Sequence, residues 1–293
     1  MSYLLQKLAV SALQLVVLSA VMFVIFRLAP GDYFTATLEN PQQSPQTMDA
    51  LRRARGLERS WPRQYAAWIK SCARGEFGQS IAYGLPVSRL LAPRVGKTLQ
   101  IAIPGLLLGW LIGLGGALLI RRPAFDPGVA AAAMVPDVIV ISLALWAAVA
   151  MGLSINGPWL PVLGLALSII PIVYLHSSSE LAKARALDFV RIAQSRGVHG
   201  ARLWMGYILP AAANALVSLA GLSAAAAIGS SFIVEALTGW PGVGPMFLEA
   251  VQSRDYPVVL TTLTALSAVL IVSNLIADLV LYRLDPRIRS AVR

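Results

Sequence analysis

Charged residues are scarce in this sequence. They make up 13% of the 293 residues, and the apolar set AVILMFWYC makes up 57%. Soluble globular domains carry about 25% charged residues. Mean hydropathy is +0.69, and so few charges cannot cover a folded domain in water. The composition therefore excludes a soluble enzyme or nucleic-acid-binding domain and predicts an all-α, polytopic membrane protein.

Residues that carry chemistry are also few. Cys72 is the one cysteine, so an internal disulfide and a thiolate metal cluster are excluded. His176 and His199 form no histidine cluster, and no G-x-S-x-G elbow occurs. Gly96-Lys97-Thr98 looks like the end of a phosphate-binding loop, but Leu91 stands where that loop needs a glycine. We therefore predict no catalytic, cofactor or metal site in this chain.

Long apolar runs are what the sequence has instead. A helix that crosses a bilayer needs about 20 mostly apolar residues. The first run is too long for a signal peptide and is predicted to be a retained span. The six predicted spans are Leu8–Leu28, Leu99–Ile120, Val129–Met151, Leu160–Leu175, Ala211–Leu237 and Val258–Tyr282.

Basic residues in the short loops predict the orientation. They follow the second and sixth spans and fill the stretch between the fourth and fifth, whereas only Arg254 lies between the fifth and sixth. Short basic loops stay cytoplasmic, so both termini are predicted to be cytoplasmic. Residues 29–98 hold ten Lys and Arg on the other side, but a segment this long translocates regardless of its charge.

Three parts follow along the chain: residues 1–28 with the first span, an extracytoplasmic segment at 29–98, and a five-span core at 99–293. Ser44-Pro45 predicts a short helix that Gly56 ends. A second helix is predicted by apolar residues at helical spacing, and it packs either on the protein's own outer face or against lipid headgroups or a docking protein. These residues are Trp61, Tyr65, Trp68, Ile69 and Cys72.

Small residues recur every four positions in two spans. Such spacing lets helix backbones approach closely in lipid, either within the chain or against a second membrane subunit. The second span carries Gly105, Gly109, Gly113 and Ala117, and the fifth carries Gly221, Ala225 and Gly229.

Ionisable residues inside the spans are candidates for a transport path. Asp137 lies early in the third span, where it either faces a water-filled path or satisfies a neighbouring helix. Asp278 lies near the end of the sixth span, where Arg283 could meet it. One acid without a partner gives little support to a proton relay, although an ion-coupled secondary transporter remains the alternative function.

Residues 176–210 form the longest predicted cytoplasmic loop. Ser177-Ser178-Ser179-Glu180 has capping-box spacing and predicts the start of a helix. Leu187, Val190 and Ala193 would share one side of that helix, and Gly197 would end it in a left-handed conformation. Ordinary helix connections run about 2–8 residues, so a longer one is expected to be functional.

This loop resembles the EAA loop of permease subunits of ATP-binding-cassette importers. Gly197 and Leu209-Pro210 have the spacing of that motif, with Arg191-Ile192-Ala193 at the E-A-A positions and Tyr207 in place of an isoleucine. The peptide-importer branch commonly reads like D-Y-V-R-T-A-R-A-K-G. This chain has Asp188-Phe189-Val190-Arg191-Ile192-Ala193-Gln194-Ser195-Arg196-Gly197.

Five further stretches resemble motifs of the same family, in the same order along nearly the whole chain. They are Leu28-Ala29-Pro30-Gly31-Asp32, Gly75-Glu76-Phe77-Gly78-Gln79-Ser80, Trp240-Pro241-Gly242-Val243-Gly244, Arg254-Asp255-Tyr256-Pro257 and Leu284-Asp285-Pro286-Arg287-Ile288-Arg289.

The resemblance implies a type I importer permease fold in the bacterial inner membrane, as the first permease of the dipeptide, oligopeptide and nickel branch. It implies a second permease, two cytoplasmic ATPases that bind ATP-Mg, and an extracytoplasmic binding protein. Peptides are the first expectation for the substrate, ahead of nickel chelates and other small solutes. Residues 186–196 would form the coupling helix, and the coupling loop would use Asp188, Phe189, Arg191, Ala193, Arg196, Gly197, Leu209 and Pro210.

Overall fold

The computed structural model describes residues 2–28, 60–119 and 126–284. The predicted helix at 44–56, most of the motifs at 28–32 and 284–289, and Arg121 and Arg122 lie outside the described residues. Within them every regular element is helical, apart from an isolated β-bridge between Gln79 and Pro86. The all-α prediction is confirmed.

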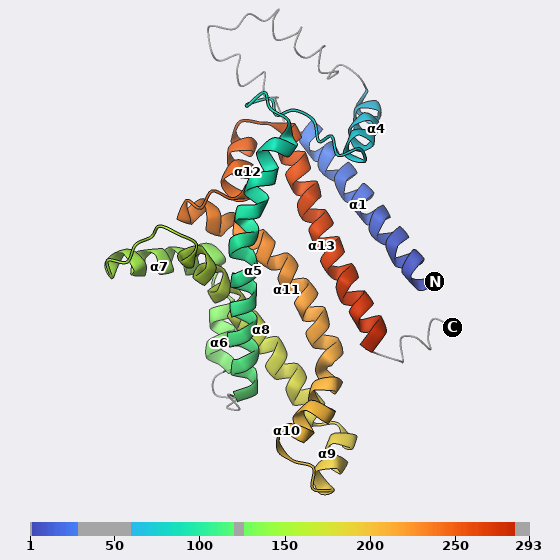
Figure 1. The fold of residues 1–293 in the computed structure, drawn as a ribbon, viewed down its shortest axis with the longest axis vertical. Coiled ribbons are helices and arrows are strands. Elements are labelled where there is room, and N and C mark those ends of the chain that lie inside the picture. Colours follow the sequence, from blue (N-terminus) through green and yellow to red (C-terminus); the bar gives the residue numbers. More distant parts are fainter. Residues whose placement is uncertain (1, 29–59, 120–125, 285–293) are drawn as a thin grey trace, which may run out of the picture.

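Five long helices form the bundle: α1 (Ser2–Leu28), α5 (Val87–Leu119), α8 (Trp159–Arg185), α11 (Leu209–Thr238) and α13 (Tyr256–Leu284). Helix α8 packs on α5 and α11, and α13 lies between α11 and α1 (Figure 1). Each of the five is long and apolar enough to cross a membrane.

The short helices gather at the two ends of the bundle. At one end, called here the α9 end, lie α9 (Asp188–Ser195), α10 (Gly200–Leu203) and a π-helical turn η2 (Trp204–Ile208). At the other, the α12 end, lie α12 (Val243–Gln252) and α4 (Trp61–Cys72) (Figure 1).

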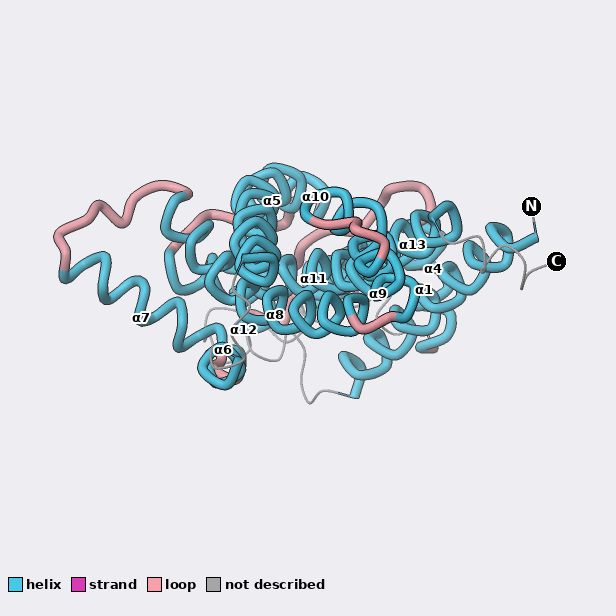
Figure 2. Tube along the Cα trace, turned by 90° about the horizontal axis from the view of Figure 1, so that it is seen from below, coloured by secondary structure: helices cyan, strands magenta, loops and turns pink. Residues whose placement is uncertain are grey.

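The third predicted span, Val129–Met151, is not one helix. It is divided into α6 (Asp126–Ala133) and α7 (Asp137–Ala150), which meet at 96°. Pro136 stands at the break and disfavours helical backbone at the residue before it. Helix α7 therefore projects from the side of the bundle away from α1 (Figures 1 and 2). Six spans are reached when the bent pair is counted as one.

The fourth span is longer than its sequence predicts, and the capping box is wrong. Helix α8 continues to Arg185, beyond the predicted end at Leu175, and Ser177-Ser178-Ser179-Glu180 lie inside it. The helix continues because Leu181 and Ala184 are buried against the rest of the α9 end. Packing of an apolar stripe thus outweighs a local capping signal.

The fifth span also begins earlier than Ala211, since the helical run starts at Gly200. The π-helical turn at Trp204–Ile208 stands directly before Pro210. A proline ring has no N–H to donate and collides with the carbonyl four residues back, here Gly206. The wider turn relieves that collision and lets the helix run on into α11.

The glycines of the second span serve packing within the chain. A Cβ added at Gly105 or Gly109 would lie 2.8 Å from the side chain of Leu165 or Ile169 on α8. Gly221 of α11 meets α13 in the same way, whereas Gly229 faces open space. For α5, the small residues therefore serve packing within the chain and not contact with a second subunit.

Candidate functional site

Helix α9 has two distinct faces. Val190 and Ala193 are buried in an apolar core shared with Leu181 of α8, Leu203 of α10 and Ile208 of the π-helical turn. This confirms the face that helical spacing predicts for Val190 and Ala193. Leu187 does not belong to it, since its side chain is exposed and its extended backbone precedes the first turn.

The outer face of α9 combines apolar and charged side chains. Phe189 and Ile192 lie one turn apart and are 49% and 52% exposed. Asp188 in the first turn, Arg191, and Arg196 just after the helix are also exposed. A helix held by one face thus presents a second apolar face next to basic residues.

Gly197 ends α9 as predicted. Its φ is +83°, in the region that side chains with a Cβ rarely adopt. The Val198 N–H donates to the Ala193 carbonyl at 3.1 Å, and the Gly197 N–H donates to the Gln194 carbonyl at 3.0 Å. These two bonds form a Schellman motif, in which the half-buried Val198 returns to the core that holds Ala193.

Leu209 and Pro210 lie at the start of α11, inside the continuous helical run rather than ahead of it. Leu209 packs against the same core as α9, and Pro210 is exposed. The structure therefore gathers the predicted coupling residues around one short helix and the two helix ends that carry it.

Asp137 lies apart from this group, in the first turn of α7. Its Oδ2 accepts a hydrogen bond from Ser230 Oγ of α11 at 2.6 Å. The sequence left two roles open for Asp137, a place on a water-filled path or a bond to a neighbouring helix. This contact favours the bond to a neighbouring helix. Asp278 forms an ion pair with Lys7 of α1 at 2.7 Å, a partner that the sequence did not suggest.

Glu235 is an acid inside the fifth predicted span that sequence reasoning passed over. Its side chain is fully buried near the end of α11, and its Oε2 accepts the Gly244 N–H at 2.6 Å. A Cβ at Gly242 would lie 2.2 Å from the Glu235 carboxyl carbon. Gly242 therefore makes room for a carboxylate, and Gly244 donates to it, an arrangement that a search for paired acids would not find.

A second buried carboxylate joins two of the sequence motifs. Asp255 accepts hydrogen bonds from Ser80 Oγ at 2.5 Å and from the N–H groups of Ile81 and Ala82, each at 3.1 Å. The stretches 75–80 and 254–257 are thereby held together at the α12 end. This contact gives Ser80 and Asp255, one from each motif, a structural role.

Helix α4 forms as predicted and packs on the protein's own α1. Tyr65 Oη donates to the Val16 carbonyl at 2.9 Å and lies 2.8 Å from Ser19 Oγ, and its ring lies 5.6 Å from that of Phe23. These contacts favour packing on the protein's own outer face over contact with lipid headgroups or a docking protein.

Helix α4 also carries Cys72. Partial burial raises the pKa of the Cys72 thiol to about 11.

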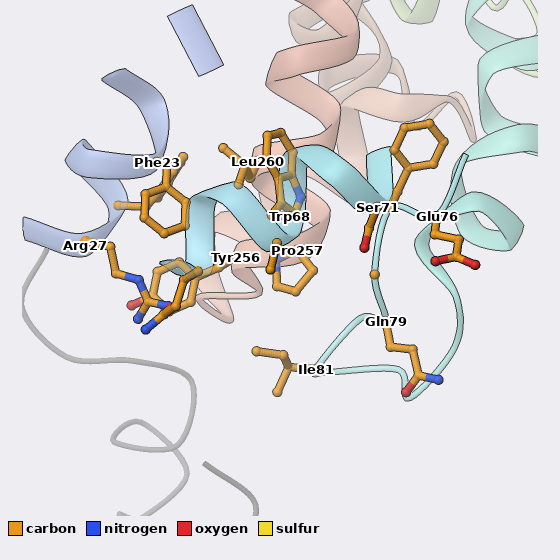
Figure 3. A pocket seen from close by; sticks show the side chains of 15 residues that line it. Phe23, Arg27, Trp68, Ser71, Glu76, Gln79, Ile81, Tyr256, Pro257 and Leu260 are labelled. Atoms are coloured by element: carbon orange, nitrogen blue, oxygen red, sulfur yellow. The ribbon is translucent and has the colours of Figure 1, made fainter. Parts of the chain in front are cut away.

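A cavity of about 440 Å³ opens beneath α4, between the end of α1, the 76–81 loop and the start of α13 (Figure 3). Aromatic side chains form part of its wall, including Phe23, Trp68 and Tyr256, and Arg27 and Glu76 lie on it as well. It lies on the side of α13 that faces α1, far from α9 along the bundle.

Sequence comparison assigns nearly the whole chain. The family described as "Binding-protein-dependent transport system inner membrane component" matches residues 101–290, and the N-terminal model of the same transport-system membrane component matches residues 1–101. The chain belongs to this family. It is a permease of the importers that the EAA-type loop suggested, a multi-pass inner-membrane transport protein and not a catalytic subunit.

Curated relatives align over almost their full length. The oligopeptide transport system permease AppB of Bacillus subtilis is 28% identical, over 98% of this chain and 99% of its own. The dipeptide permease DppB of Lactococcus lactis is 25% identical, over 98% and 99%. The glutathione permease GsiC of Salmonella choleraesuis is 25% identical, over 99% of each chain.

The fold itself has a counterpart among solved structures. A chain of the inward-facing MetNI methionine ABC transporter superposes with a TM-score of 0.57 at 18% identity, over 67% of this chain and 96% of its own. This likeness confirms the ABC permease fold. The alternative of an ion-coupled secondary transporter has no support in these comparisons.

Proposed function

We propose that this permease and a second six-span permease form the path of an importer for small peptides. The dipeptide, oligopeptide and glutathione permeases that it resembles support this substrate class. Nickel chelates remain the second candidate. An extracytoplasmic binding protein would deliver the substrate, and two cytoplasmic ATPases would bind ATP-Mg and supply the energy.

The observation that carries the proposal is the outer face of α9. Phe189 and Ile192 are half-exposed on a helix that is already anchored by Val190 and Ala193. Exposed apolar side chains that lie together mark an interaction site, since a helix on its own gains nothing from showing them to water. In this proposal they insert into an apolar groove of one ATPase.

The charges around this face indicate what the groove should contain. Arg191 and Arg196 are exposed beside the apolar pair. Arginine pairs well with carboxylates, often through two hydrogen bonds. The groove is therefore expected to have an apolar floor and acidic residues at its rim, and docking should weaken as salt concentration rises.

A matched pair of substitutions on α9 tests the docking. Ile192→Glu puts a charge in the apolar face and should lower co-purification of the ATPases by about tenfold or more. Gln194→Glu adds the same charge at an exposed position on another side of the helix and should leave co-purification nearly unchanged. If Ile192→Glu co-purifies with as much ATPase as Gln194→Glu and the wild type do, docking through this face is refuted.

Orientation in the membrane is part of the same proposal, with α9 on the cytoplasmic side. In a Cys72→Ser background, Glu180→Cys should react with an impermeant maleimide only from the cytoplasm. Glu58→Cys, which lies outside the described residues, should react only from the opposite side. Labelling of Glu58→Cys from the cytoplasm would overturn the orientation.

ATP is proposed to bind the partner subunits and not this chain. Gly96-Lys97-Thr98 lies inside α5, where the Lys97 ammonium stands over the Trp240 ring at 5.5 Å. Lys97→Met should therefore leave the nucleotide affinity of the assembled importer unchanged. A large loss of nucleotide binding in that variant would contradict this assignment.

A further inference from the structure

Arg185 and Trp204 stack on each other where the chain leaves α8 and re-enters the bundle. Arg185 is the last residue of α8, and Trp204 is the first residue of the π-helical turn before α11. The guanidinium carbon lies 4.4 Å from the centre of the indole ring. Nη2 of Arg185 is shielded from solvent. The stack thereby closes the base of a hairpin formed by residues 186–203, which includes α9.

Apart from this stack, the two sides of the hairpin are joined by apolar contacts in the core that includes Leu181, Leu203 and Ile208. The connection from α9 to α10 contains Gly197 and Gly200, both with positive φ. The turn that follows is π-helical, a form that is rare and often marks functional positions. The apolar contacts around Val190 and Ala193 have no preferred direction. A cation over an indole face does, and it gains strength when it is desolvated.

We propose that Arg185 and Trp204 are positioning residues that make α9 move as one body with the ends of α8 and α11. A push on α9 then shifts both long helices, and is not taken up by opening of the hairpin. This inference rests on the proposed function, because the push comes from a docked ATPase. It adds a role for two residues that are not among the defining positions of the EAA-type motif, and neither needs to contact the ATPase.

The test uses the complete importer in liposomes and measures uptake of a dipeptide together with ATP hydrolysis. Arg185→Met and Trp204→Leu keep apolar bulk but remove the cation or the ring. Each should retain bound ATPase and ATP hydrolysis, while the dipeptide moved per ATP falls by about fivefold or more. Arg185→Lys and Trp204→Phe retain a cation and an aromatic face, so they should keep most of the wild-type ratio.

Lys183→Met is the matched control, because it removes a positive charge from the same turn of α8 at an exposed position. Its ratio of uptake to hydrolysis should equal that of the wild type. A wild-type ratio in both Arg185→Met and Trp204→Leu would overturn the inference. Loss of bound ATPase in these variants would also overturn it, because the pair would then serve docking. Failure of the wild-type chain to bind any ATPase would instead contradict the proposed function.

Discussion

The two ends of the bundle each have an apolar core, but they differ in where their acidic side chains lie. At the α9 end an apolar core holds a short helix whose outer face, with Phe189 and Ile192, stays exposed. At the α12 end two carboxylates are fully buried: Glu235 accepts the N–H of Gly244 nearby in the chain, and Asp255 accepts N–H groups of the distant 81–82 segment. The acidic side chain of α9, Asp188, is thus exposed, whereas Glu235 and Asp255 are buried.

The exposed face of α9 can bind and release a partner, whereas the buried carboxylates of the α12 end hold the protein's own segments together. Apolar contacts on an exposed helix can form and break with a partner at modest cost. Buried hydrogen bonds to a carboxylate are costly to break, because each group left without its partner is penalised in a low-dielectric interior. Substitutions at the α12 end should therefore act on stability, and those at the α9 end on coupling.

The largest expected loss of stability comes from Asp255→Ala. It leaves the buried Ser80 hydroxyl without its acceptor, at about 1–3 kcal/mol, and it also removes the acceptor of the less buried N–H groups of Ile81 and Ala82. Thermal unfolding in detergent should show the lowest melting temperature among the variants discussed here. Asp255→Asn keeps an acceptor and should lose less. A melting temperature of Asp255→Ala equal to the wild-type value would contradict this account of the α12 end.

The next effect is expected for Gly244→Ala. The added Cβ would lie 2.4 Å from the Phe232 carbonyl oxygen, a backbone atom that cannot move aside alone. Overpacking of this kind costs about 1–3 kcal/mol. Gly229→Ala adds the same methyl group in the interior of α11, where nothing lies within 4 Å. If Gly244→Ala and Gly229→Ala unfold at the same temperature, the tight packing described at Gly244 is contradicted.

Gly197→Val should destabilise the protein less but abolish transport. A side chain at positive φ costs roughly 1 kcal/mol, and more when it is β-branched. The cost falls on the turn that returns the chain from α9, so uptake should stop while the subunit still inserts. Gly197→Asn is the control, because asparagine tolerates this backbone region. Wild-type uptake by Gly197→Val would contradict the coupling role.

Asp188→Lys probes the same surface without straining the backbone. Asp188 is exposed in the first turn of α9, where a negative charge also suits the helix N-terminus. Reversal of its charge should reduce uptake by disturbing the docked face, with at most about 1 kcal/mol of lost stability. Binding of substrate to the separate binding protein should stay normal. Unchanged uptake would remove Asp188 from the docking surface.

The last prediction concerns the reactivity of Cys72 on α4. Since burial raises the pKa of its thiol to about 11, little thiolate exists at pH 8. Alkylation there should be about a hundredfold slower than for a thiol of pKa 9, and it should accelerate with pH until about pH 11. Fast alkylation of Cys72 at pH 8 would show that the thiol is not buried as described.

The sequence predicted the α9 end better than the α12 end for physical reasons. Val190, Ala193 and Gly197 lie within eight residues, so helical spacing and a glycine stop suffice to place them. Glu235 depends on Gly244, and Asp255 on Ile81, and no local pattern reports such pairs. The motifs that hold these residues were recognised by resemblance, while their contacts needed the folded chain.

Errors in the helix boundaries have a similar origin. The break before α7 could have been predicted from Pro136, which stands inside an otherwise apolar run. The extension of α8 past Leu175 could not, because Leu181 and Ala184 become core positions only when α9 and α10 pack against them. Pro210 predicted a helix start, yet the π-helical turn before it lets the helix pass through.

Crosslinking from the two ends tests the central claim most directly. In a Cys72→Ser background, Phe189→Cys on α9 and Leu248→Cys on α12 place one thiol at each end, at side chains that are both 49% exposed. Treatment of the assembled importer with a short reagent that carries a maleimide and a photoreactive diazirine, followed by illumination, should join Phe189→Cys to an ATPase subunit and should join Leu248→Cys to none. An ATPase adduct from Leu248→Cys, or its absence from Phe189→Cys in an importer that still transports, would contradict the account.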